Sequence, residues 1–134
     1  MMSSRPWIAA AIAIAATTAH AGSDPADPAM LALASRSGCL TCHRIEASPR
    51  PESTLPIGPA WESVAMRYRG QAGAAEQVTR TVLAGSNPYA SHWKGQASGL
   101  AMPPNAVAIS DADARQLVDW ILALDPAQRA APAR

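Results

Sequence analysis

The residues with the clearest chemical potential are two cysteines and the histidine after the second, in the sequence Cys39-Leu40-Thr41-Cys42-His43. Cysteines three positions apart lie roughly one helical turn from each other, so both thiols can bond the two vinyl groups along one haem edge. The histidine is then carried under the ring, where an imidazole nitrogen can bind the iron. Because the chain has only two cysteines, the pattern predicts one covalently attached haem c.

Other interpretations of the motif fit the chain less well. A thioredoxin-like dithiol belongs near a βαβ pattern, and no alternating or β-branched run predicts strands here. A structural zinc site needs four ligands, but only His20 and His92 remain, and His20 lies in a segment expected to be removed. A disulfide between the cysteines would close a very short loop and add little stability. A short motif can also match by chance, so the rest of the chain must agree with it.

The first 21 residues are typical of a secretory signal peptide. Arg5 gives a positive start, residues 7–16 are apolar, and residues 19–21 (AHA) have the small-x-small pattern of a cleavage site. This apolar stretch is far shorter than the ~20 residues that span a bilayer, so we expect no membrane anchor. Cleavage would leave residues 22–134 as a single exported domain.

The charge balance excludes some partners. Removing Arg5 would leave ten basic and ten acidic residues, from 11 and 10 in the full chain. No basic run predicts nucleic-acid binding, and no acidic tail predicts an electrostatic arm. A neutral protein meets its partners without strong long-range steering. The core of so short a chain is small, and a buried porphyrin would add a large apolar surface to it.

Four segments have the pattern of a helix: 27–38, 59–69, 74–84 and 110–124. Asp27 and Pro28 suit the N-cap and first position of the first helix, whose end near Gly38 leads directly into the motif. Gly85 is placed to close the third helix. Ser110 opens the last helix with an acidic first turn. The apolar residues of that helix recur at helical spacing and are Ala114, Leu117, Val118, Ile121 and Leu124.

The remaining segments are predicted to be loops. Residues 44–57 carry three prolines and no periodicity, and residues 86–109 are rich in Gly, Pro, Ser and Asn. The tail after Asp125-Pro126 is expected to fray. The predicted fold is all-α, with about four helices wrapped around a loop-rich pocket for one haem.

An electron-transfer haem needs a second axial ligand from the far side of the ring. Met30, Met66, Met102 and His92 are the candidates. Met30 and Met66 lie on helical stripes, where methionine is more often core filler. Met102 lies outside the helices and precedes two prolines that stiffen the backbone. We favour Met102, with His92 as the competitor, although a lone loop histidine is more often a solvated surface residue.

The chain resembles the small bacterial class I cytochromes c, which are monohaem periplasmic electron carriers. The resemblance covers nearly all of residues 27–124, and its segments occur in the family's order: 38–43, 57–61, 69–73, 102–105 and 110–124. It implies a cytochrome c-like fold with haem c attached through Cys39 and Cys42. It also implies that His43 and Met102 are the axial ligands of the iron.

The resemblance implies roles for three further residues. The carbonyl of Pro59 would accept the ring N–H of His43, which would fix the imidazole and raise its basicity. Asn105 corresponds to the family's amide beside the methionine sulfur. Trp93 corresponds to a tryptophan that packs on the haem and donates its N–H to a propionate, although simple core packing would also explain it. Two segments depart from compact members of the family: the loop 44–55 is longer, and residues 96–101 are inserted before Met102.

The expected function is one-electron transfer and not catalysis, because both axial positions on iron are filled. By resemblance, the partners are an upstream electron donor and a periplasmic reductase, peroxidase or terminal oxidase. We expect a monomer with no membrane span. Two alternatives stay open: a haem c subunit of a larger redox complex, and a haem enzyme or ligand-binding protein in which Met102 dissociates readily.

Overall fold

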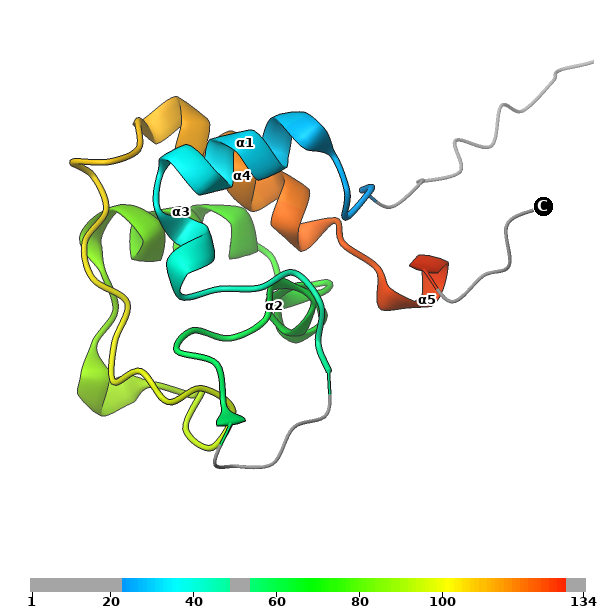
Figure 1. Ribbon diagram of the computed structural model, residues 1–134. Helices are drawn as coiled ribbons and strands as arrows, with labels where there is room; N and C mark the ends of the chain where they lie inside the picture. The colour runs from blue at the N-terminus through cyan, green and yellow to red at the C-terminus, as the bar shows by residue number, and fades with distance from the viewer. Residues whose placement is uncertain (1–22, 49–53, 130–134) are drawn as a thin grey trace, which may run out of the picture.

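The computed structural model describes residues 23–48 and 54–129. Over these residues the only β pairing is two isolated bridges, between Ser23 and Leu124 and between Lys94 and Ala97. The all-α prediction is therefore confirmed. The helices, with η for a 3₁₀ helix, are α1 (Pro28–Arg36), η1 (Cys39–Thr41), α2 (Trp61–Tyr68), α3 (Ala74–Ala84), η3 (Pro88–Ala90), α4 (Asp111–Leu122) and α5 (Pro126–Arg129) (Figure 1).

Helix α1 begins where the sequence predicts and ends at Arg36, two residues before the predicted stop near Gly38. The side chain of Asp27 accepts hydrogen bonds from the N–H groups of Ala29 (2.9 Å) and Met30 (3.2 Å), which caps the helix. At the other end Gly38 has φ 74°, in the left-handed region that favours glycine. This turn directs the chain from α1 into η1, and so into the cysteine motif.

Helix α4 is the centre of the core, because it packs against α1, α2 and α3. Its N-cap is Ser110, whose hydroxyl accepts the N–H of Asp113 at 3.1 Å. All five residues of its predicted apolar stripe are buried. Trp120, which the stripe does not include, is also buried, and its indole N–H donates to the carbonyl of Asp24 at 2.9 Å. This bond ties the lead-in before α1 to α4.

Helix α2 begins at Trp61, two residues after the predicted start at Pro59. Its N-cap residue, Ala60, offers no side-chain cap. Instead the N–H of Trp61 donates to the carbonyl of Arg44 (2.9 Å), and the N–H of Glu62 to that of Ile45 (3.0 Å). The first amides of a helix lack partners within the helix, so these contacts satisfy them and dock α2 on the segment after the motif.

Two expectations from the sequence are wrong. The helical pattern predicts core packing for Met66, but its side chain is 49% exposed. Trp61, Val64 and Ala65 form the buried face of α2, and Met66 lies beside that face toward solvent. Residues 126–129, where the tail expected to fray begins, form α5, and residues 130–134 lie outside the described residues. Met30 is buried, as predicted.

No helix within residues 23–48 and 54–129 is long and apolar enough to cross a membrane. The predicted signal peptide, residues 1–21, lies outside the described residues. So does the middle of the proline-rich loop, residues 49–53.

Candidate functional site

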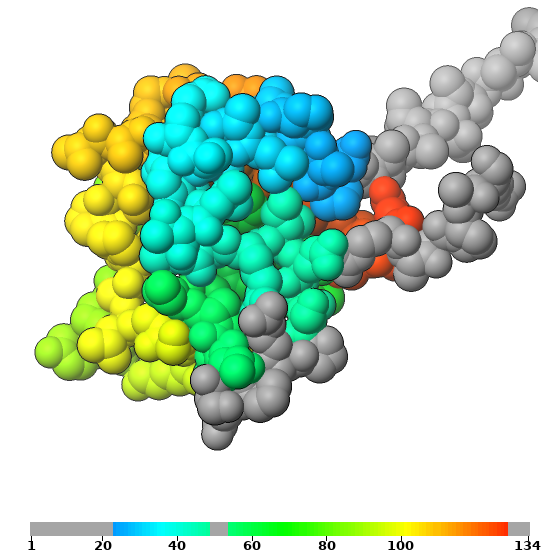
Figure 2. Space-filling model, in the orientation of Figure 1, coloured from blue at the N-terminus to red at the C-terminus, as the bar shows by residue number. Residues whose placement is uncertain are grey.

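The cysteine–histidine motif forms η1 and the turn after it. The N–H groups of Cys42 and His43 both donate to the carbonyl of Cys39, at 3.3 Å and 3.0 Å. The motif therefore completes one helical turn, as its spacing predicts. Both cysteines are free and half-buried, and burial raises the pKa of the Cys39 thiol. In Figure 2 this segment (cyan) and the segment around residue 100 (yellow) lie on the face toward the viewer.

The imidazole of His43 is fixed by a backbone carbonyl. Its Nδ1 lies 2.8 Å from the carbonyl oxygen of Pro59. A carbonyl can only accept, so Nδ1 carries the proton and Nε2 keeps its lone pair. Burial lowers the pKa of His43 and outweighs the opposing effect of this hydrogen bond. The ring is therefore neutral at pH 7, and neutral imidazole is the form that binds metals.

Gly58 allows the backbone to approach this ring. A Cβ atom at position 58 would lie 2.6 Å from Cε1 and 2.8 Å from Nδ1 of His43, closer than real Cβ atoms approach. The N–H of Gly58 donates to the carbonyl of Cys42 at 2.8 Å. The side chain of Glu62, which is 2% exposed, accepts the N–H of Ala47 at 2.8 Å. Hydrogen bonds thus join the segment from Gly58 to Glu62 to the end of the motif and to the residues that follow it.

Trp61 links His43 to the core. Its ring stacks on the imidazole with centroids 5.9 Å apart and planes 24° apart. It also meets Trp120 of α4 edge-on, with centroids 5.7 Å apart. In the sequence Trp61 stands out only as the end of the family segment 57–61, and its stacking on His43 emerges from the fold. The signal available in the sequence is an aromatic residue directly after Gly-Pro-Ala.

Met102 lies in a loop held against the end of α3. Its N–H donates to the hydroxyl of Ser86 at 2.8 Å, and the N–H of Ser86 donates back to the carbonyl of Met102 at 2.9 Å. Gly85, the predicted helix stop, has φ 83°, and a Cβ there would lie 2.9 Å from the Met102 carbonyl oxygen. Met102 is half-buried and packs against the same core as Cys39. Sequence reasoning missed Ser86.

Asn105 follows Met102 closely, and its side-chain amide bonds to the backbone. Nδ2 donates to the carbonyl of Pro103 at 2.7 Å and lies 3.3 Å from that of Val82. The position beside the sulfur of Met102 that the resemblance assigns to Asn105 is not among these contacts and stays a proposal. The second hydrogen bond joins the loop once more to α3.

Trp93 and His92 form a cluster with the end of α2. Trp93 is half-buried against the core, and the guanidinium carbon of Arg67 lies 5.7 Å from its ring centroid. The exposed His92 ring lies 5.0 Å from Trp93 and 6.1 Å from Tyr68 between centroids. Partial burial lowers the pKa of His92, and the charge of Arg67 lowers it further. His92 is therefore a surface histidine, as the sequence favours.

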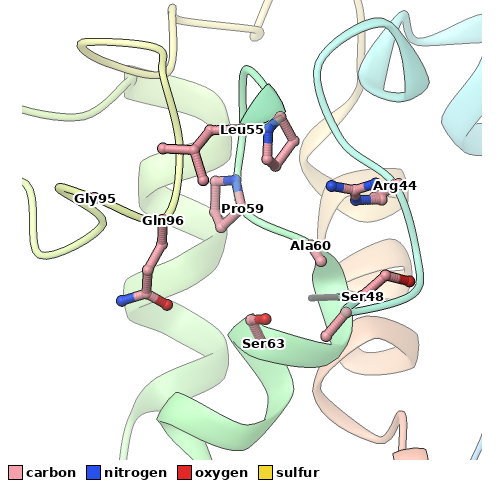
Figure 3. A pocket seen from close by; sticks show the side chains of 10 residues that line it. Arg44, Ser48, Leu55, Pro59, Ala60, Ser63, Gly95 and Gln96 are labelled. Atoms are coloured by element: carbon pink, nitrogen blue, oxygen red, sulfur yellow. The ribbon is translucent and has the colours of Figure 1, made fainter. Parts of the chain in front are cut away.

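A hollow of about 370 Å³ borders the segment that holds His43 (Figure 3). It is lined by residues of 44–48, 55–63 and 95–96, so both segments that depart from the compact family contribute to it. In Figure 3 the end of the Arg44 side chain points toward Pro59. Neither cysteine, His43 nor Met102 is among the described residues that line the hollow. The hollow is therefore separate from the motif, although Pro59, whose carbonyl accepts the His43 N–H, is one of its lining residues.

Comparisons with known proteins agree on one family. The family model for cytochrome c matches residues 31–125. The chain is 41% identical over 100 residues to cytochrome c-551 of Allochromatium vinosum, an alignment that covers 75% of this chain and 90% of that protein. It is 31% identical over 118 residues to cytochrome c-551 of Pseudomonas aeruginosa, covering 88% of this chain and 96% of that protein.

The fold is similar to the crystal structure of cytochrome c552 from Nitrosomonas europaea, with a TM-score of 0.56 and 34% identity. That match covers 71% of this chain and 99% of the other. The sequence and the fold thus point to the same group of proteins. The chain belongs to the cytochrome c family.

Proposed function

We propose that this chain is a periplasmic carrier that passes single electrons between redox partner proteins, through a haem c whose iron lies between His43 and Met102. Family membership supplies the general part of this statement. Cytochromes c carry covalent haem c with its iron, and they are electron carriers rather than enzymes. The location, the axial ligands and the residue roles are the parts that we propose.

The residues of the site fit this cofactor. Cys39 and Cys42 present free thiols one helical turn apart, and both would form thioethers. His43 would bind the iron through Nε2, because Nδ1 is engaged by Pro59 at 2.8 Å. This hydrogen bond is the observation that carries the proposal, since it orients a neutral imidazole directly after the second cysteine. When bound, the haem supplies an iron that alternates between Fe(III) and Fe(II).

The chain's own residues would limit this chemistry to electron transfer. The thioether of Met102 would fill the second axial position and leave no site for a substrate on the iron. Histidine and methionine together favour the reduced iron and raise its potential. Trp61, stacked on His43 and packed against Trp120, would keep water from the histidine side. A rigid, dry site limits the reorganisation that accompanies each electron transfer.

Replacing Met102 tests the axial ligand. In haem-loaded Met102→Ala we expect loss of the sulfur-to-iron charge-transfer band and a lower reduction potential. Met66→Ala is the matched control, because Met66 is a half-exposed methionine on the surface of α2. An unchanged spectrum in Met102→Ala would reject this ligand, and a changed spectrum in His92→Ala would then identify the competitor.

Attachment and export are tested separately. Replacing both Cys39 and Cys42 with alanine should abolish covalent haem, so a haem-stained band of this variant on a denaturing gel would contradict the attachment. For export, the protein purified from the periplasm should begin at Gly22, as read by mass spectrometry. An intact N-terminus there would reject cleavage after Ala21.

The partners follow from the proposed role and not from a contact in this structure. We infer a monomer that receives electrons from an upstream donor and delivers them to a periplasmic reductase, peroxidase or terminal oxidase. Size-exclusion chromatography of the native protein separates a free carrier from a subunit of a larger redox complex.

A further inference from the structure

The loop that carries Met102 has few backbone donors with which to anchor itself. Residues 103 and 104 are both proline and have no N–H group. The donors available near the proposed iron ligand are therefore the N–H of Met102 before the prolines and those of Asn105 and Ala106 after them. Each of these three amides has a partner at the end of α3 or directly after it.

The last turn of α3 receives the part of the loop after the prolines. The N–H of Asn105 donates to the carbonyl of Val82 at 3.1 Å, and the N–H of Ala106 to that of Leu83 at 3.3 Å. Carbonyls in the last turn of a helix lack partners within it, so the loop satisfies groups that α3 leaves open. These contacts fix residues 105–106, but they lie on the far side of two prolines from Met102.

Ser86 fixes Met102 itself. Its hydroxyl accepts the Met102 N–H at 2.8 Å, and its own N–H donates to the Met102 carbonyl at 2.9 Å. Both polar groups of the Met102 backbone are thus bonded to one residue. The contact is close because Gly85, which precedes Ser86, has no Cβ to meet the Met102 carbonyl.

We propose that Ser86 is a positioning residue for the iron ligand, and that its hydroxyl controls how readily Met102 leaves the iron. The inference rests on the proposed role of Met102 as a ligand. A thioether is a weak donor, so its bond to iron persists only where the backbone holds the sulfur in place. Ser86 would therefore help to keep the iron closed to external ligands, as an electron carrier requires.

The test measures cyanide binding to the ferric, haem-loaded protein. Ser86→Ala keeps the backbone bond to the Met102 carbonyl and removes the acceptor for the Met102 N–H. We expect the apparent affinity for cyanide to rise about fivefold, the factor that corresponds to one ordinary hydrogen bond. Ser86→Thr keeps a hydroxyl at the same position and should bind cyanide nearly as weakly as the natural chain.

Thr81→Ala is the matched control. Thr81 lies in the last turn of α3, five positions before Ser86, but its hydroxyl donates to the carbonyl of Gln77 at 3.1 Å, within the helix. Thermal unfolding of each variant, measured alongside, separates a general loss of stability from a local effect on Met102. A cyanide affinity that rises in Ser86→Ala, stays low in Thr81→Ala and is restored by Ser86→Thr supports the proposal.

Two results would overturn it. Equal cyanide affinities in Ser86→Ala and Thr81→Ala would show that the hydroxyl does not restrain Met102, while Met102 could still be the ligand. Unchanged spectra and cyanide affinity in Met102→Ala would instead reject the ligand assignment, and this inference with it. The two failures are distinguishable because they occur in different variants.

Discussion

The ring of His43 is held on three sides by one short segment. Pro59 accepts its Nδ1–H at 2.8 Å, Gly58 leaves only backbone against the ring, and Trp61 stacks on it. These residues are close in sequence, but all three lie 15 or more positions beyond His43. The orientation of the imidazole is therefore sensitive to small changes in that segment.

A methyl group at position 58 should disturb His43 directly. In Gly58→Ala the new Cβ would overlap the imidazole ring, so the ring or the segment must move. We expect a loss of about 1–3 kcal/mol in the free energy of unfolding, as for other overpacked sites, together with a changed haem spectrum. Denaturant unfolding and visible absorption of the haem-loaded protein measure the two effects.

Gly99→Ala is the control for this change. A Cβ at position 99 would lie 2.6 Å from the carbonyl oxygen of Ile57, so it also clashes, but it does not meet His43. Stability should fall in this variant while the haem spectrum stays the same. Identical spectra in Gly58→Ala and the natural chain would show that the close approach to His43 is not needed.

The pKa of His92 should depend on Arg67. Partial burial lowers this pKa first, and the positive charge of Arg67 adds to the effect. Arg67→Gln removes the charge, so the pKa should rise toward its ordinary value. An NMR titration of His92 in the reduced protein measures the shift. Arg69→Gln is the control, because Arg69 is paired with Asp125 at 3.3 Å.

The lowered pKa of His92 also predicts how the stability of the folded chain changes with pH. Because the pKa of His92 is lower in the folded chain than in the unfolded one, the unfolded chain binds more protons as the pH falls below about 6.5. Stability should therefore decrease with falling pH over that range, and less so in Arg67→Gln. An unchanged pKa of His92 in that variant would exclude Arg67 as a cause.

At the scale of the elements, the ends of helices place the site. Gly38 ends α1 in the left-handed conformation and starts the motif, and Gly85 ends α3 where Met102 approaches. The N-terminus of α2 is docked by the carbonyls of Arg44 and Ile45 instead of by a side-chain cap. Both proposed iron ligands are thus held by helix termini, where backbone groups still need partners.

The N-cap of α4 should contribute measurably to stability. In Ser110→Ala the N–H of Asp113 loses its acceptor at 3.1 Å, and we expect a loss of about 1 kcal/mol. Ser110→Asp retains an acceptor and should stay close to the natural chain. Urea unfolding of the haem-loaded protein compares the three. Equal losses in both variants would mean that the capping bond is not the cause.

At the scale of the whole molecule, α4 joins the parts that carry the site. It contacts α1, α2 and α3, and Trp120 on α4 touches Trp61, which stacks on His43. The core is small, so a covalently held haem would contribute a large share of its apolar surface. Net charge should have little influence on how the molecule meets its partners, because the chain without residues 1–21 has equal numbers of acidic and basic residues.

Electron transfer with protein partners should therefore depend only mildly on salt. With no net charge to steer the encounter, rates measured by stopped flow should change less than about tenfold between low and physiological ionic strength. The most demanding test measures these rates with a natural redox partner that carries a large net charge. A steep dependence would reveal a local charged patch that directs docking.

The sequence by itself determined the features that depend on a few neighbouring residues. The cysteine spacing, the Asp27 and Ser110 caps and the glycine stops at 38 and 85 follow from backbone preferences and helical periodicity. These local rules also placed the buried stripe of α4. The all-α fold followed from the same signals.

Only the tertiary structure decided which distant groups meet. Pro59 reaches His43, and Ser86 reaches Met102, each across 16 positions of chain. Met66 faces solvent although its helical pattern suits a core, because α2 turns a different side toward α4. Such contacts depend on how separate helices pack, and packing is set by shape and volume across the whole core, which no local pattern encodes.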